Sequence, residues 1–197
     1  MLLEIKTADE LRDPDLEARW AERREGPQAE VLRYILGAFA ERGGPIPIGD
    51  IEAALAGRTA AQVRQELATL DEKDLILLEE GEVRLAYPFS AMPTPFVVRL
   101  QDGRERFACC AIDALGIPAM LNARVVVRSR CQHCGEPLEL AVDAAGPLGA
   151  DEVMVWVGRR GPGEELAHGG SRIPAVDQVT AYNEVDRGQG QGVIAPA

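Results

Sequence analysis

Two thiols and a carboxyl group lie close together in the run Phe107-Ala-Cys-Cys-Ala-Ile-Asp113. Cys110 precedes Asp113 by three residues, and Cys109 precedes it by four. If this run is helical, both thiols lie within one turn of the same carboxylate. An ionised thiol is a soft ligand and a nucleophile, and a carboxyl group can carry a proton. The cluster therefore indicates thiolate chemistry on a soft metal or an electrophile, with a local proton carrier.

The other two cysteines, Cys131 and Cys134, flank His133 in a run that has the form of one knuckle of a zinc site. A structural zinc ion needs four ligands, usually from two such knuckles, and the second knuckle is absent from the sequence. The spacing therefore favours a partial site, or a tight turn with Gly135, over a complete zinc site. The remaining histidine, His168, is interpreted as a loop residue without a role.

The bulk composition is that of an acidic globular protein. The chain has 197 residues, of which 46% are hydrophobic and 27% charged, with a formal net charge of −11. Such a charge repels phosphates, so a nucleic-acid or anionic-membrane partner is not favoured. We see no signal peptide and no apolar run of the ~18 residues that span a bilayer, which predicts a cytoplasmic protein with reduced thiols.

Residues 1–26 form a charged N-terminal extension, and residues 27–88 follow the winged-helix layout of three helices and a hairpin. Apolar residues at helical spacing predict the three helices, the first ending at Gly43 and the third capped by Thr59. Two short strands that turn at 80–82 complete the subdomain. The helical stripes are Leu32, Ile35, Leu36 and Phe39, then Ile51, Ala54 and Leu55, then Val63, Leu67 and Leu70.

Many winged helices bind DNA, but the charge of this subdomain does not favour that function. Residues 27–88 contain six basic and eleven acidic side chains. The third helix, which would enter a DNA groove, carries Arg64 but also Glu66 and Asp71, whereas a groove-binding helix should be basic. The subdomain is therefore expected to pack on the second half of the chain or to present a surface to a partner.

In the second half, residues 96–160, apolar and polar residues alternate as in β-strands. This half contains both cysteine pairs. A proline-punctuated linker at 87–95 precedes it. We expect a helix over about 107–115 that ends at Gly116-Ile-Pro118, and a Gly/Pro-rich, partly disordered tail at 161–197. The fold class is α+β, with a mixed, mostly antiparallel sheet. The predicted strands are 96–100, 124–129, 138–142 and 152–157.

The segment from Phe107 to Val142 resembles the catalytic region of the organomercurial (alkylmercury) lyase family. The resembling features are Cys110-Ala-Ile-Asp113, the apolar stretch that follows it to Pro118, and the strand and cysteine Val125-Val-Val-Arg-Ser-Arg-Cys131. The winged-helix-like region also belongs to that family's layout, so the resemblance covers roughly residues 32–142.

The resemblance implies protonolysis of carbon–mercury bonds. In that family one thiolate binds the mercury, a second adds electron density, and an aspartate delivers a proton to the departing carbon. Cys110 maps to the metal-binding nucleophile, Asp113 to the proton carrier and Cys131 to a structural cysteine. No cofactor is implied, and Hg²⁺ stays on the thiolates until a soluble thiol or mercuric reductase takes it. Sulfur suits a very soft metal, and an acid assists a poor leaving group.

The chain departs from the family pattern because it has no cysteine after Cys134. The family's second catalytic cysteine lies downstream, in a later strand region, and the segment from Gly163 onward does not match it. Either Cys109 or Cys134 takes that role, or the chain has lost or changed the activity. Adjacent cysteines chelate one ion with strain, so Cys134 is the better substitute if its loop reaches Cys110.

Three functions compete at this point. The first is an alkylmercury lyase-like enzyme whose catalytic residues are Cys110 and Asp113. The second is a non-enzymatic protein that binds or senses soft metals through Cys109, Cys110 and Cys134. For both, the expected ligand is an organomercurial or another thiol-reactive small molecule. The third function, a winged-helix regulator, is disfavoured by the acidic surface.

Overall fold

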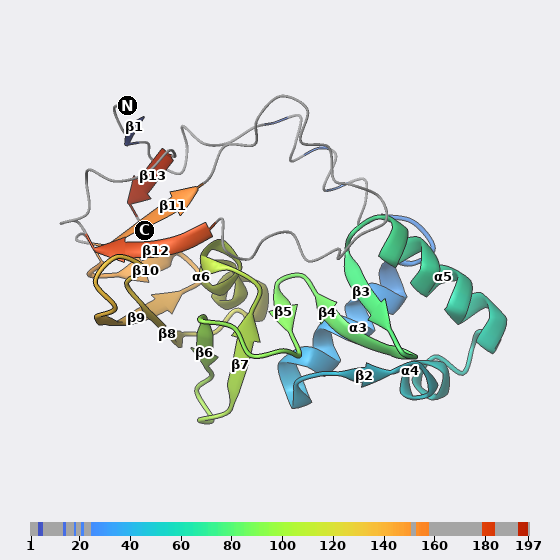
Figure 1. Ribbon diagram of the computed structural model, residues 1–197. Coiled ribbons are helices and arrows are strands. Elements are labelled where there is room, and N and C mark those ends of the chain that lie inside the picture. The colour runs from blue at the N-terminus through green and yellow to red at the C-terminus, as the bar shows by residue number, and fades with distance from the viewer. Residues whose placement is uncertain are drawn as a thin grey trace. The chain divides into compact units, whose positions relative to one another are not determined.

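The computed structural model describes residues 25–150 and 153–157, the short strands at 4–5, 179–183 and 193–196, and the single positions 14, 18 and 21. The chain divides into two compact units. Unit 1 comprises Met1–Arg12 and Thr94–Ala197, and unit 2 comprises Asp13–Pro93. Helices and mostly antiparallel strands make up the described elements, which confirms the α+β class (Figure 1). No helix within the described residues is both long and apolar enough to cross a membrane.

The described residues 25–93 of unit 2 contain three helices that bury most of the predicted apolar positions. Ala54, predicted to face inward, is exposed, and Leu36 and Leu55 are half-buried. Ile35, Ile51 and Leu67, one from each helix, are fully buried. Burial of one face of each helix is what an apolar period of 3.6 residues produces. The helices and the hairpin occur in the predicted order, and their assignment to the winged-helix fold stays a prediction. The helices are α3 (Ala29–Arg42), α4 (Ile48–Ala54) and α5 (Ala60–Glu72).

The strands of unit 2 all pair with one central strand, β4 (Glu82–Ala86). Its partners include β5 (Phe89–Ser90), which lies inside the segment predicted to be a linker. That prediction was wrong because Phe89 is fully buried and stacks on Phe39, with ring centroids 6.1 Å apart. Burial of the ring outweighs the neighbouring prolines. The other two partners are β2 (Ile46–Pro47) and β3 (Ile76–Glu79).

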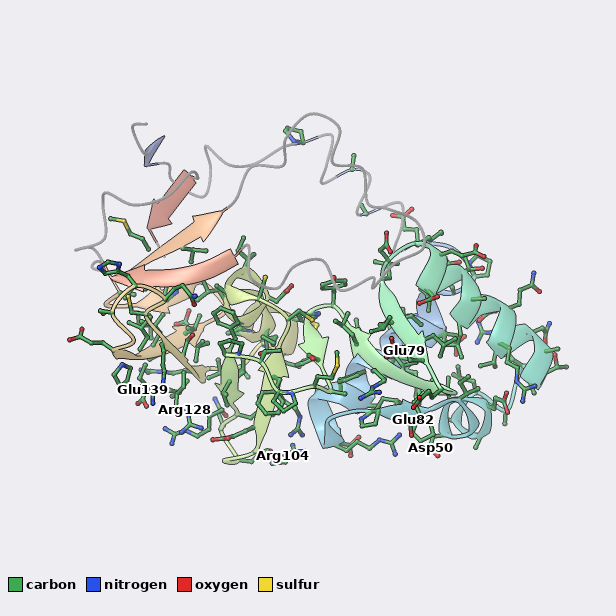
Figure 2. The ribbon with its side chains drawn as sticks, viewed as in Figure 1. Asp50, Glu79, Glu82, Arg104, Arg128 and Glu139 are labelled. Carbon is green, nitrogen blue, oxygen red and sulfur yellow. The ribbon has the colours of Figure 1, made fainter. Side chains whose placement is uncertain are left out.

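Ion pairs neutralise most of the basic side chains of residues 27–88. Four of the six basic residues in this segment contact carboxylates of the same segment, including Asp50 and Glu79, which Figure 2 labels. An arginine that is already paired contributes little to phosphate binding. The arrangement therefore agrees with a surface that does not favour DNA. The pairs are Arg42–Asp50, Arg58–Glu30, Arg58–Glu66, Arg64–Glu52 and Arg84–Glu79.

Unit 1 contains an antiparallel sheet in the order β10-β9-β8-β6-β7. Val98, the middle residue of β6, lies opposite Arg106 and Val127, and both valines are buried. The alternation along these strands thus turns one face inward. The strands are β6 (Val97–Arg99), β7 (Glu105–Ala108), β8 (Val125–Arg130), β9 (Pro137–Asp143) and β10 (Gly146–Leu148).

A second sheet of unit 1 uses segments from both ends of the chain, in the order β1-β13-β11-β12. Two of its strands lie in residues 161–197, which the composition had predicted to be a partly disordered tail. The rest of that tail, including His168 and the Gly188–Gly192 run, lies outside the described residues. The strands are β1 (Glu4–Ile5), β11 (Val153–Val157), β12 (Val179–Asn183) and β13 (Val193–Pro196).

The helix that follows the first cysteine pair is α6 (Ala111–Leu121), and its bounds differ from the prediction. Phe107 lies in strand β7, where it pairs with Val97, so the chain there is extended rather than helical. The helix also continues through Gly116 and Pro118. Sheet pairing overrides local helix propensity at the start, and burial of Pro118 and its neighbours on the sheet face compensates for a proline inside the helix.

Substitution of Thr59 tests whether the N-terminal cap stabilises α5. Its hydroxyl accepts the Gln62 N–H and the Gln62 side chain accepts the Thr59 N–H, a complete capping box at the start of α5. We expect Thr59→Ala to lower the free energy of unfolding by about 1 kcal/mol in urea titrations. Thr69→Ala on the same helix serves as the control and should change it by less than ~0.5 kcal/mol. Equal effects would argue against the cap.

Candidate functional site

Cys110 lies at the N-terminus of α6, where it caps the helix instead of lying inside it. Its backbone is extended, with φ −151° and ψ −179°, and its sulfur accepts the backbone N–H of Asp113 at 3.4 Å. The N–H of Ile112 is also directed at this sulfur. The expectation that both thiols share a helical turn with Asp113 is therefore wrong for the backbone. The Cys110–Asp113 pair nevertheless forms, because a helix cap approaches the third helical residue.

The Cys110 thiol and the Asp113 carboxyl group are also close enough for each to affect the pKa of the other. Burial raises the pKa of Asp113 above its usual value, against the opposing effect of the Cys110 hydrogen bonds. Burial also raises the pKa of Cys110, and the negative charge of Asp113 raises it further. Both shifts favour the protonated forms. The pair is thus a thiol beside a carboxyl group that retains its proton at a higher pH than an exposed aspartate.

Cys109 is more deeply buried than its neighbour, with a relative exposure of 4%. Burial raises its pKa, and the charges of Asp113 and Cys110 act in the same direction. The three groups are therefore close enough to interact. A thiol with this environment resists ionisation and is poorly accessible to a ligand from solution, so Cys109 is a weaker candidate for a metal ligand than Cys110.

The second cysteine pair forms a compact turn between β8 and β9. The Cys131 N–H donates to the Glu136 carbonyl, and the Gly135 N–H donates to the Cys131 carbonyl, both at 2.8 Å. The thiols of Cys131 and Cys134 interact with each other. Cys131 is buried, as expected of a structural residue, whereas Cys134 and His133 are exposed. The turn thus brings a buried thiol, Cys131, together with an exposed thiol, Cys134.

The two cysteine pairs remain separate from each other. Within the described residues, no three side chains of His, Cys, Asp or Glu form a group that could hold a metal ion. The groups that act on Cys110 do not include Cys134, which has Cys131 as its sulfur partner. The structure therefore does not assemble Cys134 with Cys110 and Asp113. All four cysteines lie in the described residues, and none forms a disulfide.

A small cavity of about 20 Å³ lies between α6 and the sheet of unit 1. Ala111, the residue after Cys110, lines it together with Ser129, which lies two residues before Cys131. Its walls are otherwise apolar, and its volume is close to that of one water-sized probe. A larger surface hollow lies near Arg99 and Arg124, away from the cysteines. Ala111, next to the first cysteine pair, and Ser129, near the second, therefore face the same cavity.

Comparisons with known proteins find alkylmercury lyases that resemble the segment containing this site. The family model for alkylmercury lyase (MerB) matches residues 89–169, which include Asp113 and all four cysteines. An alkylmercury lyase of Staphylococcus epidermidis is 35% identical over 113 residues, which make up 57% of this chain and 50% of that protein. The enzyme of Streptomyces lividans is 32% identical over the same shares. Residues 89–169 of the chain therefore resemble alkylmercury lyases.

The alkylmercury lyase fold extends beyond the matched segment. The crystal structure of the mercury-bound form of MerB2 aligns with a TM-score of 0.72 over 93% of this chain and 92% of that one. At 22% sequence identity this likeness shows a common fold. By sequence, the chain spans about half the length of the curated alkylmercury lyases that it matches, with 50% of the S. epidermidis enzyme and 40% of the Bacillus cereus enzyme covered.

The thiol–carboxyl contact predicts how Cys110 responds to alkylation. Asp113→Asn removes the negative charge that raises the pKa of Cys110, so that pKa should fall. At a fixed alkaline pH, alkylation of Cys110 should then accelerate about tenfold for each unit by which the pKa falls. Peptide mass spectrometry after timed iodoacetamide treatment measures the rate. Asp102→Asn, in the β6–β7 turn, is the control and should leave the rate unchanged; an unchanged rate in Asp113→Asn would contradict the coupling.

Proposed function

We propose that this chain is an alkylmercury lyase that cleaves carbon–mercury bonds with Cys110 and Asp113. The observation that carries the proposal is the close approach of Cys110 and Asp113 at the start of α6, where the Cys110 sulfur accepts the Asp113 backbone N–H at 3.4 Å. A soft nucleophile and a proton donor close together suit this reaction, because mercury favours sulfur and the leaving carbon needs a proton. Both residues lie within the segment that matches the family model.

The first step is the capture of an organomercurial, R–Hg–X, in which X is a soluble thiolate. The Cys110 sulfur bonds to mercury, the Hg–X bond breaks, and the thiol proton leaves with X as HX. The backbone N–H groups of Ile112 and Asp113 stabilise negative charge on the sulfur as it forms. They offset part of the effect of burial, which disfavours the thiolate.

The second step is protonolysis. The proton of the Asp113 carboxyl group moves to the carbon, the electron pair of the C–Hg bond becomes the C–H bond, and Hg²⁺ remains on Cys110. A carboxyl group whose pKa is raised by burial holds this proton until it is needed. An incoming soluble thiol then returns a proton to Asp113 and contributes its thiolate to mercury. No resident cofactor enters these steps.

A soluble thiol is our proposal for the second sulfur ligand, since this chain has no cysteine after Cys134. Cys109 adjoins Cys110, and adjacent cysteines chelate one ion with strain, while Cys134 contacts Cys131 instead. A soluble thiol or mercuric reductase would finally remove Hg²⁺. The same need for reduced thiols supports a cytoplasmic location.

Hydrocarbon release tests the proposal. In excess thiol, wild-type protein should release benzene from phenylmercuric acetate faster than thiol alone, as followed by gas chromatography. Cys110→Ala should reduce the rate to the background, because it removes the mercury ligand. Asp113→Asn should lower kcat by about 10²–10⁴-fold, because general acid catalysis is lost.

The control is Met120→Ala, which changes an exposed residue at the other end of α6 and should retain the activity. A rate for Cys110→Ala equal to that of wild type would remove the catalytic assignment. Stoichiometric mercury binding without hydrocarbon release by the wild-type protein would instead support the non-enzymatic soft-metal binding function.

A further inference from the structure

The proposed reaction leaves one pair of thiols unused. Cys131 and Cys134 interact in the β8–β9 turn, where Cys131 is buried and Cys134 is exposed. The turn is held by two backbone hydrogen bonds and by Gly135, whose φ of +73° favours glycine. The two sulfurs are therefore held together by the backbone before any ligand binds. Such preorganisation lowers the cost of chelation.

The number of donors in this turn selects the type of metal ion. Within the part of the chain that the structure describes, no third His, Cys, Asp or Glu joins the two sulfurs as a metal ligand. A structural zinc ion requires four ligands, so two thiols alone suit it poorly. Soft ions that accept two sulfur ligands, with Hg²⁺ as the leading case, fit the pair. The product of the proposed reaction is such an ion.

The register of the sheet brings this turn close to Cys110. Strand β6 separates β7 from β8, and Val97 lies opposite both Phe107 and Arg128. Since β7 and β8 are both antiparallel to β6, they run in the same direction. Cys110 follows Phe107 by three residues, and Cys131 follows Arg128 by three. Both cysteine pairs thus emerge at the same end of the sheet, about two strand spacings or roughly 10 Å apart.

We propose that Cys131 and Cys134 form a second, two-coordinate site for Hg²⁺, which accepts the ion from Cys110 after the carbon–mercury bond is cleaved. The role as acceptor rests on the proposed function, whereas the binding site does not. In the exchange, two Hg–S bonds to Cys131 and Cys134 form, and the bonds from mercury to Cys110 and to the soluble thiolate break. The two protons released by the acceptor thiols are taken up by Cys110 and the soluble thiolate, so the exchange needs no redox partner.

Mercury retention by the full-length protein tests the site. Protein carrying one equivalent of mercuric chloride is titrated with a soluble monothiol, and the bound mercury is measured after gel filtration. Because two linked thiols bind one ion cooperatively, Cys134→Ser should release half of its mercury at ~100-fold less monothiol than wild type. Gln132→Ala, an exposed change in the same turn, should behave like wild type. Equal retention by Cys134→Ser and wild type would overturn the proposal.

Two further measurements separate this site from the reaction. Cys110→Ala should retain mercuric chloride as wild type does even though it releases no hydrocarbon, so loss of retention in Cys110→Ala alone would refute the second site. After a single turnover of phenylmercuric acetate by wild type, iodoacetamide should label Cys110 and leave Cys134 protected. The reverse labelling would refute the transfer. Retention without hydrocarbon release in wild type would instead refute the proposed function and leave the second site standing.

Discussion

The ladder of hydrogen bonds on both sides of β6 is the constraint on which the site depends. Because Val97 pairs with both Phe107 and Arg128, the ends of β7 and β8 are fixed at the same level of the sheet. The Thr94 hydroxyl donates to the carbonyl of Ala108, the residue before Cys109, at 2.6 Å and so restrains the position of the chain there. A shift of one residue in this register would turn each side chain to the opposite face and displace Cys110 from the start of α6.

Burial then determines the protonation of the Cys110–Asp113 pair. The helix N–H groups favour a thiolate at Cys110, but burial and the neighbouring carboxylate act against it and raise the pKa. The same burial raises the pKa of Asp113. Each unit of such a shift corresponds to about 1.4 kcal/mol in favour of the protonated form. Both groups of the resting pair therefore favour their protonated forms. In the proposed reaction, formation of the sulfur–mercury bond has to displace the proton from the thiol.

The two cysteine pairs differ in the way that their proposed roles require. Cys110 lies beside a proton donor and in a partly buried position, which suits bond cleavage away from bulk water. Cys134 is exposed and lies beside a second sulfur, which suits exchange with soluble thiols. Separation of the pairs would allow the first to accept a new substrate while the second still holds the product.

The sequence by itself determined the elements whose signals are local. The stripe of Val63, Leu67 and Leu70 behind Thr59 defined α5, and the Cys110–Asp113 spacing indicated the pair that we propose to be reactive, because capping and helical periodicity act over a few residues. Only the tertiary structure decided that Phe107 is extended, that Phe89 pairs with β4, and that Cys134 contacts Cys131 rather than Cys110. These outcomes depend on pairing between strands distant in the sequence, whose register no local pattern encodes.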